Sequence, residues 1–299
     1  MFEDLHGIMV PIASPCNEAD RFLGDAFAAH GDRLYEQGVQ GLYVCGATGD
    51  GYSMRLAERK RAVEIAVELS RKHGGKVITH IGAPNTHDAI ELAEHSAKTG
   101  VNAISSMPPA NRSHAELISY YTDIGRAAQL PLLVYHIPIL TGHVLTVDEM
   151  TRLLDIDHVI GFKFSDWNLF FMHRVMQKRP DTIVFNGNDE VLLPGLLFGA
   201  IGGIGMNYNL FPRLFLAIYH AAMDKEIERG MDLQNRFLAY ADVFWRYGGI
   251  KANFETLMRE TDGAPYYWRC PRPARNEEFD RKFLAEVRPK IEDIEKAIA

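Results

Sequence analysis

Lys163 is the residue with the clearest potential for chemistry, because it lies inside the apolar run Val159–Ser165. Lysine is rarely buried unless it is paired or takes part in a reaction. If the run is a β-strand, alternation places Gly161, Lys163 and Ser165 on one face and the apolar side chains on the other. Burial lowers the pKa of an amine and frees the lone pair that attacks a carbonyl carbon, which suits a Schiff-base lysine. The alternative is a lysine whose flexible stem carries the amine out to water.

Tyr135 is a second candidate, since it lies in Pro131–Ile137, the apolar run that precedes the Lys163 run. Consecutive strands of a parallel barrel are neighbours, which would place Tyr135 beside Lys163. A phenol next to an amine can carry protons during imine formation and cleavage of a carbon–carbon bond. A tyrosine that only packs in the core is the alternative.

Two turns carry candidate binding groups. The turn Gly46–Gly51 contains Ala47 and Thr48, and its glycines allow backbone amides to approach an anion such as a carboxylate. A plain turn is the alternative here. Asp189 and Glu190 follow a later apolar run, where adjacent carboxylates would suit sugar hydroxyls. Asp189 could also cap the N-terminus of the next helix, and the two roles are compatible.

These positions depend on a regular alternation of short apolar runs and longer helical patterns, such as Met54–His73 and Thr86–Thr99. Apolar strands that alternate with helices indicate a parallel sheet covered by helices. The runs are Gly7–Pro15, Gly41–Thr48, Lys76–Ala83, Ala103–Met107, Pro131–Ile137, Val159–Ser165, Thr182–Gly187 and Gly202–Met206. Eight such units predict an α/β fold, a (β/α)₈ TIM barrel. A doubly wound sheet is the runner-up, but the first run is not followed by a cofactor fingerprint.

The predicted barrel spans residues 1–225, and residues 226–299 are expected to form a C-terminal helical extension packed on it. Helical patterns in the extension cover Glu226–Tyr247, Gly249–Asp262 and Asn276–Ala299, and the proline-rich stretch Gly263–Pro273 links the last two.

Composition excludes several classes of function. The chain has 299 residues, a formal net charge of -7 and no basic run, which argues against nucleic-acid binding. The longest apolar stretch, Val191–Met206, contains Pro194 and is short for a membrane span, so we expect a buried helix and then a buried strand. Cys16, Cys45 and Cys270 have neither zinc spacing nor a disulfide pattern. These thiols and an acidic N-terminus predict a cytoplasmic protein.

Histidine spacing gives no case for a metal. His80 and His136 fall in apolar runs, and neither has a second ligand at metal spacing. We expect both to be core histidines with satisfied hydrogen bonds.

Three motifs carry a family resemblance over nearly the whole chain. Gly46-Ala47-Thr48-Gly49-Asp50, Tyr135-His136-Ile137-Pro138 and Gly161-Phe162-Lys163 resemble, in this order, motifs of the class I pyruvate aldolases. That family includes dihydrodipicolinate synthase and N-acetylneuraminate lyase. The resemblance implies a barrel with a helical extension, usually as a homotetramer, and no cofactor beyond a Schiff base with the substrate. It implies Lys163 as nucleophile, Tyr135 as proton relay, and the Ala47–Thr48 turn as the site of the pyruvate carboxylate.

Within this family the sequence is most similar to the sialic acid lyase branch. Tyr135–Gly142 and Gly161–Asp166 are similar to that branch, and Gly187, Asp189 and Glu190 match its segment for the polyol tail. Dihydrodipicolinate synthases carry an arginine for a second carboxylate at the position of Leu140, so that activity is disfavoured. The substrate contacts that the resemblance implies are Ala47, Thr48, Ser165, Gly187, Asp189, Glu190 and Met206.

The sequence departs from the family at the proton relay. A hydroxylated residue is usual where Ala47 stands, and the lyases tend to have serine where Met206 stands. The relay's other tyrosine, from a neighbouring subunit, would align in Met107–Arg112, which contains none. The candidate substitutes are Thr48, Ser165, water and, more remotely, Tyr120 or Tyr121.

These observations lead to hypotheses of different classes. The first is a Schiff-base lyase that cleaves a 2-keto acid to pyruvate and an N-acylated or polyhydroxylated aldehyde, with N-acetylneuraminate as the favoured substrate. The second keeps the imine but dehydrates or cleaves a 2-keto-3-deoxy sugar acid. The third is a barrel that binds a keto acid without turning it over.

Overall fold

Eight parallel strands form the centre of the molecule and pair in chain order into a closed barrel. The structure is a computed structural model that describes residues 5–262, 266–272 and 276–298. The strands are β1 (Gly7–Pro11), β2 (Gly41–Val44), β3 (Lys76–His80), β4 (Ala103–Ser106), β5 (Leu132–His136), β6 (Val159–Phe164), β7 (Ile183–Asn186) and β8 (Gly202–Gly203). The predicted TIM barrel is confirmed, and a doubly wound sheet is excluded because β8 pairs with β1.

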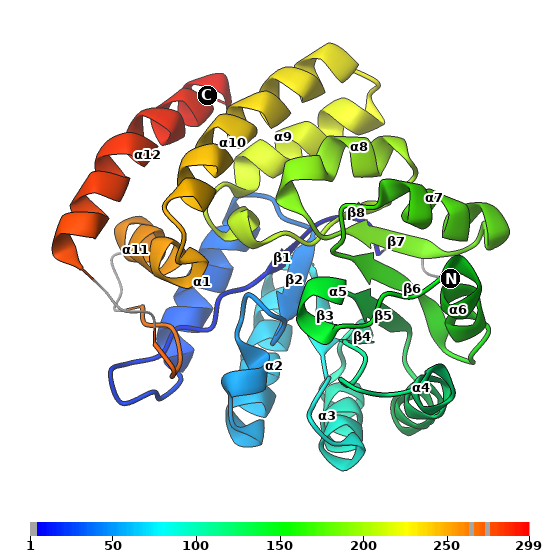
Figure 1. The fold of residues 1–299 in the computed structure, drawn as a ribbon. Helices are drawn as coiled ribbons and strands as arrows, with labels where there is room; N and C mark the ends of the chain where they lie inside the picture. The colour runs from blue at the N-terminus through cyan, green and yellow to red at the C-terminus, as the bar shows by residue number, and fades with distance from the viewer. Residues whose placement is uncertain (1–4, 263–265, 273–275, 299) are drawn as a thin grey trace.

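Helices follow the strands and cover the outside of the barrel (Figure 1). They are α1 (Gly24–Glu36), α2 (Leu56–His73), α3 (Thr86–Thr99), α4 (His114–Ala128), α5 (Pro138–Thr141), α6 (Val147–Leu154), α7 (Leu169–Lys178), α8 (Leu192–Leu197) and α9 (Pro212–Met223). The 3₁₀ turns η1 (Gly51–Ser53), η2 (Asp189–Val191) and η3 (Met206–Asn209) lie after β2, β7 and β8. Local residues set the helix ends: Asn85 caps α3 by accepting a hydrogen bond from the Asp88 N–H, and Gly100 ends it in the left-handed conformation.

Each strand ends earlier than the apolar run that predicted it. β2 stops at Val44, whereas the predicted strand continued to Thr48. The apolar run extends past the strand because Cys45 is still fully buried. Its backbone, however, no longer pairs with the neighbouring strands and forms a loop at the barrel mouth. The stretch Val191–Met206 contains α8 and then β8, a helix followed by a strand as predicted.

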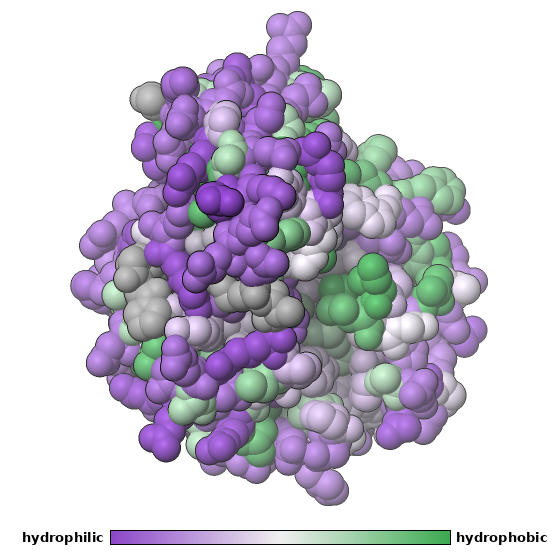
Figure 2. Space-filling model, turned by 60° about the vertical axis from the view of Figure 1, so that its left-hand side comes forward, coloured by the Kyte–Doolittle hydropathy of each residue, from purple (hydrophilic) through white to green (hydrophobic). Residues whose placement is uncertain are grey.

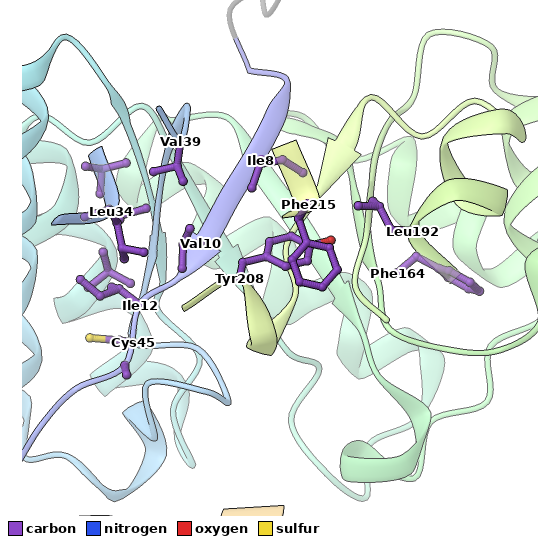
Figure 3. Close-up of a cluster of buried hydrophobic side chains, with 14 of the residues drawn as sticks. Ile8, Val10, Ile12, Leu34, Val39, Cys45, Phe164, Leu192, Tyr208 and Phe215 are labelled. Atoms are coloured by element: carbon purple, nitrogen blue, oxygen red, sulfur yellow. The ribbon is translucent and has the colours of Figure 1, made fainter. Parts of the chain in front are cut away.

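Alternation along the strands sorts the apolar side chains into two clusters. The inner cluster fills the barrel and includes Met9, Tyr43, Leu133, Tyr135 and Phe185. The outer cluster lies between the barrel and its helices, and Figure 3 shows part of it around β1. Phe162 and Phe164 belong to the outer cluster, so Lys163 between them points into the barrel, as predicted from the sequence.

One side chain joins the end of β8 to β1. Asn209 accepts a hydrogen bond from the Ala13 N–H at 3.0 Å and donates one to the Pro11 carbonyl at 3.0 Å. Its Oδ1 also lies 2.9 Å from Nε2 of His30 on α1. Because β8 has only two residues, the Asn209 side chain pairs backbone groups at the end of β1 that a longer β8 would have paired.

The C-terminal extension is helical, as predicted. Its helices α10 (Ile227–Arg246), α11 (Ile250–Asp262) and α12 (Glu277–Ile298) begin and end within one residue of the predicted patterns. α10 packs against α9 and α12 (Figure 1). Residues 263–265 and 273 of the predicted proline-rich link, and residue 299, lie outside the described residues. The division of the chain after residue 225 stays a prediction.

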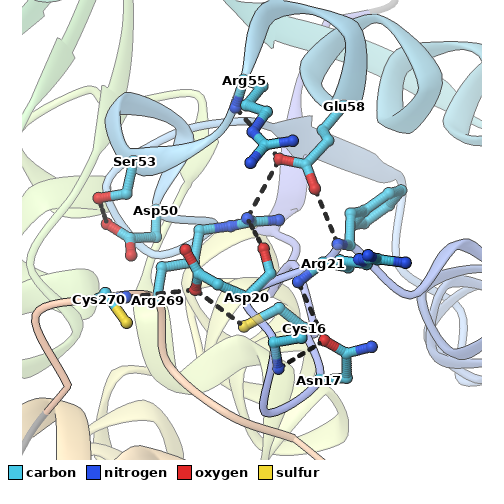
Figure 4. Close-up of polar contacts among 12 residues, drawn as sticks. Cys16, Asn17, Asp20, Arg21, Asp50, Ser53, Arg55, Glu58, Arg269 and Cys270 are labelled. Atoms are coloured by element: carbon cyan, nitrogen blue, oxygen red, sulfur yellow. Dashed lines mark hydrogen bonds and ion pairs between the residues drawn. The ribbon is translucent and has the colours of Figure 1, made fainter.

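The segment 266–272 ties the extension to the first loop of the barrel. Arg269 is buried, and its Nη1 donates to the Asp20 carbonyl at 3.1 Å and to Glu58 Oε2 at 3.2 Å (Figure 4). Cys16 also forms an isolated antiparallel bridge with Tyr267. Asp20 follows β1 and Glu58 lies in the first turn of α2. The segment therefore holds the first loop and the start of α2 together.

The surface is mainly hydrophilic on the face in Figure 2, where apolar residues gather beside a hollow near the centre. In the described part of the chain, no helix is long and apolar enough to cross a membrane. Cys16, Cys45 and Cys270 are free thiols, and the first two are buried.

Arg269→Met should lower the free energy of unfolding by about 2 kcal/mol, because it removes a charge-assisted hydrogen bond from a buried site. Urea denaturation followed by circular dichroism measures the change. Arg246→Met is the matched control: Arg246 forms an exposed ion pair with Glu286, and we expect a change below about 0.5 kcal/mol. Equal effects of the two substitutions would contradict the role of Arg269.

Candidate active site

Lys163 lies inside the barrel towards the C-terminal end of β6, with 3% of its surface exposed. The strand register pairs it with Tyr135 of β5. Its Nζ lies 4.0 Å from the centre of the Tyr135 ring and 4.5 Å from the centre of the Tyr43 ring. The amine is therefore enclosed by aromatic rings, and the alternative of a lysine that extends into bulk water is wrong.

Burial sets the protonation of this amine. It lowers the pKa of Lys163 from 10.5 to about 7, against a smaller opposing effect of the Asp189 charge. At neutral pH a substantial fraction of the amine is therefore neutral, compared with less than about one part in a thousand for an ordinary lysine. Only the neutral amine has the lone pair that attacks a carbonyl carbon.

Tyr135 and Ser165 meet beside Lys163. Burial raises the pKa of Tyr135 well above its ordinary value, and a hydrogen bond with the Ser165 hydroxyl acts in the opposite direction. The phenol is therefore neutral and can both donate and accept a proton. Gly187 makes room for this pair, since a Cβ at Gly187 would lie 2.0 Å from Ser165 Oγ. These three predicted residues are thus brought together with the lysine.

Tyr43 and His80 frame the amine from the other side of the barrel. Tyr43, which the motifs did not single out, donates a hydrogen bond to Ser105 Oγ at 3.0 Å. His80 Nδ1 lies 3.1 Å from the Cys45 carbonyl, and its Nε2 lies 3.1 Å from the Met107 nitrogen. Burial lowers the pKa of His80 well below its ordinary value, so the ring is neutral, with Nδ1 as donor and Nε2 as acceptor. Inner-face alternation in β2 is the signal that could have identified Tyr43.

Asp189 is the buried acid of the site. Its Oδ2 accepts hydrogen bonds from the backbone N–H and the side-chain amide of Asn207, at 2.9 and 2.8 Å. A Cβ at Gly205 would lie 1.6 Å from Oδ1, so glycine leaves the room that the carboxylate needs. Burial and the Glu190 charge raise the pKa of Asp189 to about 7, and the Asn207 bonds and Lys163 oppose this. The predicted helix-capping role of Asp189 is wrong, because Asn207 takes the side chain.

The C-terminal extension holds both acidic residues in place. On α10, the Tyr240 hydroxyl donates to Asn207 Oδ1 at 3.0 Å, and Asn207 in turn binds Asp189. Trp245 Nε1 donates to Glu190 Oε1 at 2.7 Å. Asn207 and Tyr240 are therefore site residues that sequence reasoning missed. Neither carries a local signal, since their partners lie far away along the chain.

The turn after β2 has the geometry of an anion site. No described residue accepts a hydrogen bond from the backbone N–H of Ala47 or Thr48. The Gly51 N–H donates to the Gly46 carbonyl at 3.1 Å and closes the turn. Backbone N–H groups without protein partners in a closed turn can bind a carboxylate. The role of Ala47 and Thr48 stays a prediction, and the geometry is compatible with it.

A cavity of about 530 Å³ opens beside this turn. Its walls are mainly apolar, and Asp50, Tyr52, Thr141 and Lys251 add polar groups. Ala47 lines the cavity and also packs against the inner cluster that contains Tyr135. The cavity therefore adjoins the part of the barrel in which Lys163 lies.

Several predicted groups lie apart from the cavity. Asp189 and Glu190 are not among its lining residues, and Met206 packs against the outer cluster. Substrate contacts from these residues stay a prediction. Ala110 does line the cavity, in the segment where the family's second tyrosine would align.

Tyr120 and Tyr121 cannot replace that tyrosine. Both lie on α4, outside the barrel, and are buried. The Tyr120 hydroxyl lies 2.7 Å from Ser106 Oγ, and the Tyr121 hydroxyl donates to the Ser106 carbonyl at 2.8 Å. Their hydroxyls therefore serve packing between α4 and β4.

Across the described residues, no group of three or more histidine, cysteine, aspartate or glutamate side chains could hold a metal ion. His136 stacks on Phe164 and Phe171, with ring centres 5.7 and 5.1 Å apart. Burial lowers the pKa of His136 to about 4, and Asp166, 3.8 Å away, opposes this. His136 and His80 are thus core histidines, as predicted.

The rate at which pyruvate forms an imine should fall below about pH 7, because Lys163 becomes protonated there. Asp189→Asn removes a negative charge that favours the ammonium form, so the pKa of Lys163 should fall further. The acidic limb of the rate should then move to lower pH. Cyanoborohydride trapping at a series of pH values, read by intact mass, measures the limb.

The matched control is Asp166→Asn, which changes a carboxylate beside His136 and should leave the limb in place. An acidic limb that moves to higher pH in Asp189→Asn would contradict the assigned electrostatics.

Known proteins resemble this chain in sequence and in fold. The family model for the Dihydrodipicolinate synthetase family matches residues 4–278. N-acetylneuraminate lyase of Rhizobium meliloti (strain 1021) is 33% identical over 234 residues, which cover 77% of this chain and 77% of that protein. N-acetylneuraminate lyase of Enterobacter sp. (strain 638) is 31% identical over 269 residues, 88% of this chain and 89% of that protein.

Among solved structures, that of N-acetylneuraminate lyase from Mycoplasma synoviae matches with a TM-score of 0.87 at 27% identity, and covers 97% of this chain and 99% of that one. These similarities confirm the predicted family, the barrel fold and the enzyme class, carbon–carbon lyases of the class I pyruvate aldolase type. Because the family match covers nearly the whole chain, the protein belongs to the dihydrodipicolinate synthetase family.

Proposed function

We propose that Lys163 attacks the ketone of a 2-keto acid, and that cleavage of the resulting Schiff base releases pyruvate. One observation carries the proposal: a buried amine with a pKa of about 7 lies against the Tyr135 ring. A lysine with no chemical task rarely occupies such an environment, and strongly shifted pKa values cluster at functional sites. The amine itself forms the covalent intermediate, so the proposed reaction uses no further cofactor.

The proposed reaction begins when the carboxylate of the keto acid binds the N–H groups of Ala47 and Thr48. Lys163 Nζ adds to the ketone carbon, and loss of water gives an iminium ion. Tyr135 carries the protons that these steps need, with Ser165 as its hydrogen-bond partner. The C3–C4 bond then breaks, its electron pair enters the iminium to give an enamine, and an aldehyde leaves. Protonation of C3 and hydrolysis release pyruvate and the free lysine.

The proposed substrate is N-acetylneuraminate. Relatives that are 33% and 31% identical carry the name N-acetylneuraminate lyase. Asp189 and Glu190, held by Asn207 and Trp245, offer carboxylate oxygens that can accept hydrogen bonds from sugar hydroxyls. Gly187 and Met206 complete the proposed binding residues.

A 2-keto-3-deoxy sugar acid, either cleaved or dehydrated, is the second candidate. The absence of a hydroxyl at Ala47 and the mainly apolar cavity favour this substrate over one that yields a heavily hydroxylated aldehyde. Dihydrodipicolinate synthesis is disfavoured, because Leu140 lines the cavity at the position of the arginine for a second carboxylate.

We also propose a cytoplasmic homotetramer without nucleic-acid or membrane partners. Ile139, Leu140 and Val144 are 87%, 60% and 80% exposed, and burial of such a surface against another subunit would be favourable. The free thiols support a reducing compartment, and the net charge of -7 disfavours nucleic acid.

Cyanoborohydride treatment with pyruvate should attach a reduced pyruvate group to Lys163, as read by intact mass and peptide mapping. Lys163→Met keeps the stem but removes the amine, so it should give no adduct and lower turnover by about a thousandfold or more. Lys178→Met, at an exposed ion pair with Asp148, is the control and should keep the adduct. A folded wild-type protein without an adduct would sink the proposal and favour a barrel that only binds keto acids.

The substrate is tested by incubation with N-acetylneuraminate and with 2-keto-3-deoxy sugar acids. We expect pyruvate from N-acetylneuraminate, measured by a coupled lactate dehydrogenase assay. Loss of water from a 2-keto-3-deoxy acid without release of pyruvate would replace the first candidate by a dehydratase.

A further inference from the structure

Tyr52 brings an unassigned hydroxyl group into the cavity. It lies in η1 after β2, lines the cavity and is 41% exposed. Among the described residues, none forms a hydrogen bond with the Tyr52 hydroxyl. A Cβ at Gly82 would lie 2.8 Å from the Tyr52 hydroxyl, so the glycine two residues after β3 gives this group its room.

Tyr52 and Tyr135 contact the same fixed ring. The ring centres of Tyr52 and His80 are 5.5 Å apart, and those of His80 and Tyr135 are 5.9 Å apart. His80 is held through both of its nitrogens, so it acts as a rigid spacer between the two phenols. The phenols are also close enough to interact electrostatically, since Tyr52 contributes to the raised pKa of Tyr135. Tyr135 thus faces Lys163, and Tyr52 faces the cavity beside it.

Other hydroxyl groups around the cavity are already engaged. Thr141, which lines the cavity, donates to the Ile137 carbonyl at 3.1 Å, and Tyr43, which lies deeper in the barrel, donates to Ser105 at 3.0 Å. Ala47 and Ala110 line the cavity without any hydroxyl. A substrate oxygen that enters the cavity from the lysine therefore meets the Tyr52 phenol as an available proton carrier.

We propose that Tyr52 is the catalytic acid and base for the aldehyde oxygen, a role that rests on the proposed Schiff-base function. In cleavage, the hydroxyl on C4 gives its proton to Tyr52 Oη while the phenol proton passes to water in the cavity. The C3–C4 electron pair moves into the iminium, so the aldehyde leaves and an enamine remains on Lys163. In the reverse direction, Tyr52 donates a proton to the aldehyde oxygen as the enamine carbon attacks the aldehyde carbon.

This assignment divides the proton transfers between two phenols. Tyr135 serves the imine and C3, because it contacts the lysine, whereas Tyr52 serves the oxygen on C4. Exchange of the pyruvate methyl protons with solvent needs the imine and the enamine but no aldehyde. Such exchange therefore reports on Lys163 and Tyr135 without Tyr52. Burial raises the pKa of Tyr52, which keeps the phenol protonated and able to donate at neutral pH.

Tyr52→Phe tests the proposal, because it keeps the ring against His80 and removes only the hydroxyl. We expect cyanoborohydride trapping and deuterium exchange into pyruvate at rates near wild type. Cleavage of N-acetylneuraminate should fall by about 10²–10⁴-fold, the usual contribution of a general acid or base. Tyr120→Phe is the matched control, since it removes a buried tyrosine hydroxyl outside the cavity and should preserve all three rates.

If the wild-type protein does not cleave N-acetylneuraminate, the same comparison uses condensation with pyruvate. The aldehyde used is the one among N-acetylmannosamine, glyceraldehyde and glyoxylate that the wild-type protein condenses with pyruvate at the highest rate. A wild-type rate of carbon–carbon cleavage or condensation in Tyr52→Phe overturns the proposal. Equal losses of exchange and cleavage also overturn it, because Tyr52 would then serve the imine or the fold. Exchange without turnover of any of these compounds by the wild type overturns it as well.

A different result would mark failure of the underlying function. Absence of trapping and of exchange in the wild-type protein removes the Schiff base itself, whatever the behaviour of Tyr52→Phe. The two failures are therefore distinguishable in one set of measurements.

Discussion

Removal of water from the Lys163 amine is the constraint on which the rest of the site depends. Alternation along β6 sends Phe162 and Phe164 outward and the lysine inward, where the rings of Tyr43 and Tyr135 enclose it. Aromatic faces attract a cation only weakly compared with water, so burial lowers the pKa to about 7. A lysine at an exposed strand end would stay cationic at neutral pH and could not act as a nucleophile.

The Asp189 charge opposes the effect of this desolvation on the Lys163 pKa and links the amine to the C-terminal extension. The carboxylate favours the ammonium form of Lys163, and the amine in turn favours ionised Asp189. Asn207 orients the carboxylate, and Tyr240 on α10 orients Asn207. Gln234, also on α10, donates to the Asp189 carbonyl at 3.1 Å. Helix α10, outside the barrel, thus holds in place the Asp189 carboxylate, whose charge acts on the pKa of Lys163.

The departures from the family pattern gather on one side of the site. Ala47 and Ala110 both line the cavity. By the family resemblance, Ala47 stands where a hydroxylated residue is usual, and Ala110 stands near the place of the second tyrosine. Tyr52 lies on the same loop as Ala47 and lines the same cavity, with its hydroxyl close to Gly82. In the proposed relay, the Tyr52 hydroxyl takes the place of the hydroxyl that is usual at position 47, five residues earlier on the same loop. The residues proposed to form the imine are separate from this loop, because Tyr135 and Lys163 lie on β5 and β6 and Ser165 directly follows β6.

The sequence by itself determined the barrel, the helices of the extension and the Lys163–Tyr135 pair, because periodicity and strand order follow from residues near one another in the chain. It placed strand ends too late, since burial continues past the ladder into residues such as Cys45. Only the tertiary structure decided that Asp189 binds Asn207 and caps no helix, and that Tyr52 faces the cavity. Contacts of this kind join segments that are distant in sequence, and a hydrogen bond between such segments leaves no periodic pattern in either one.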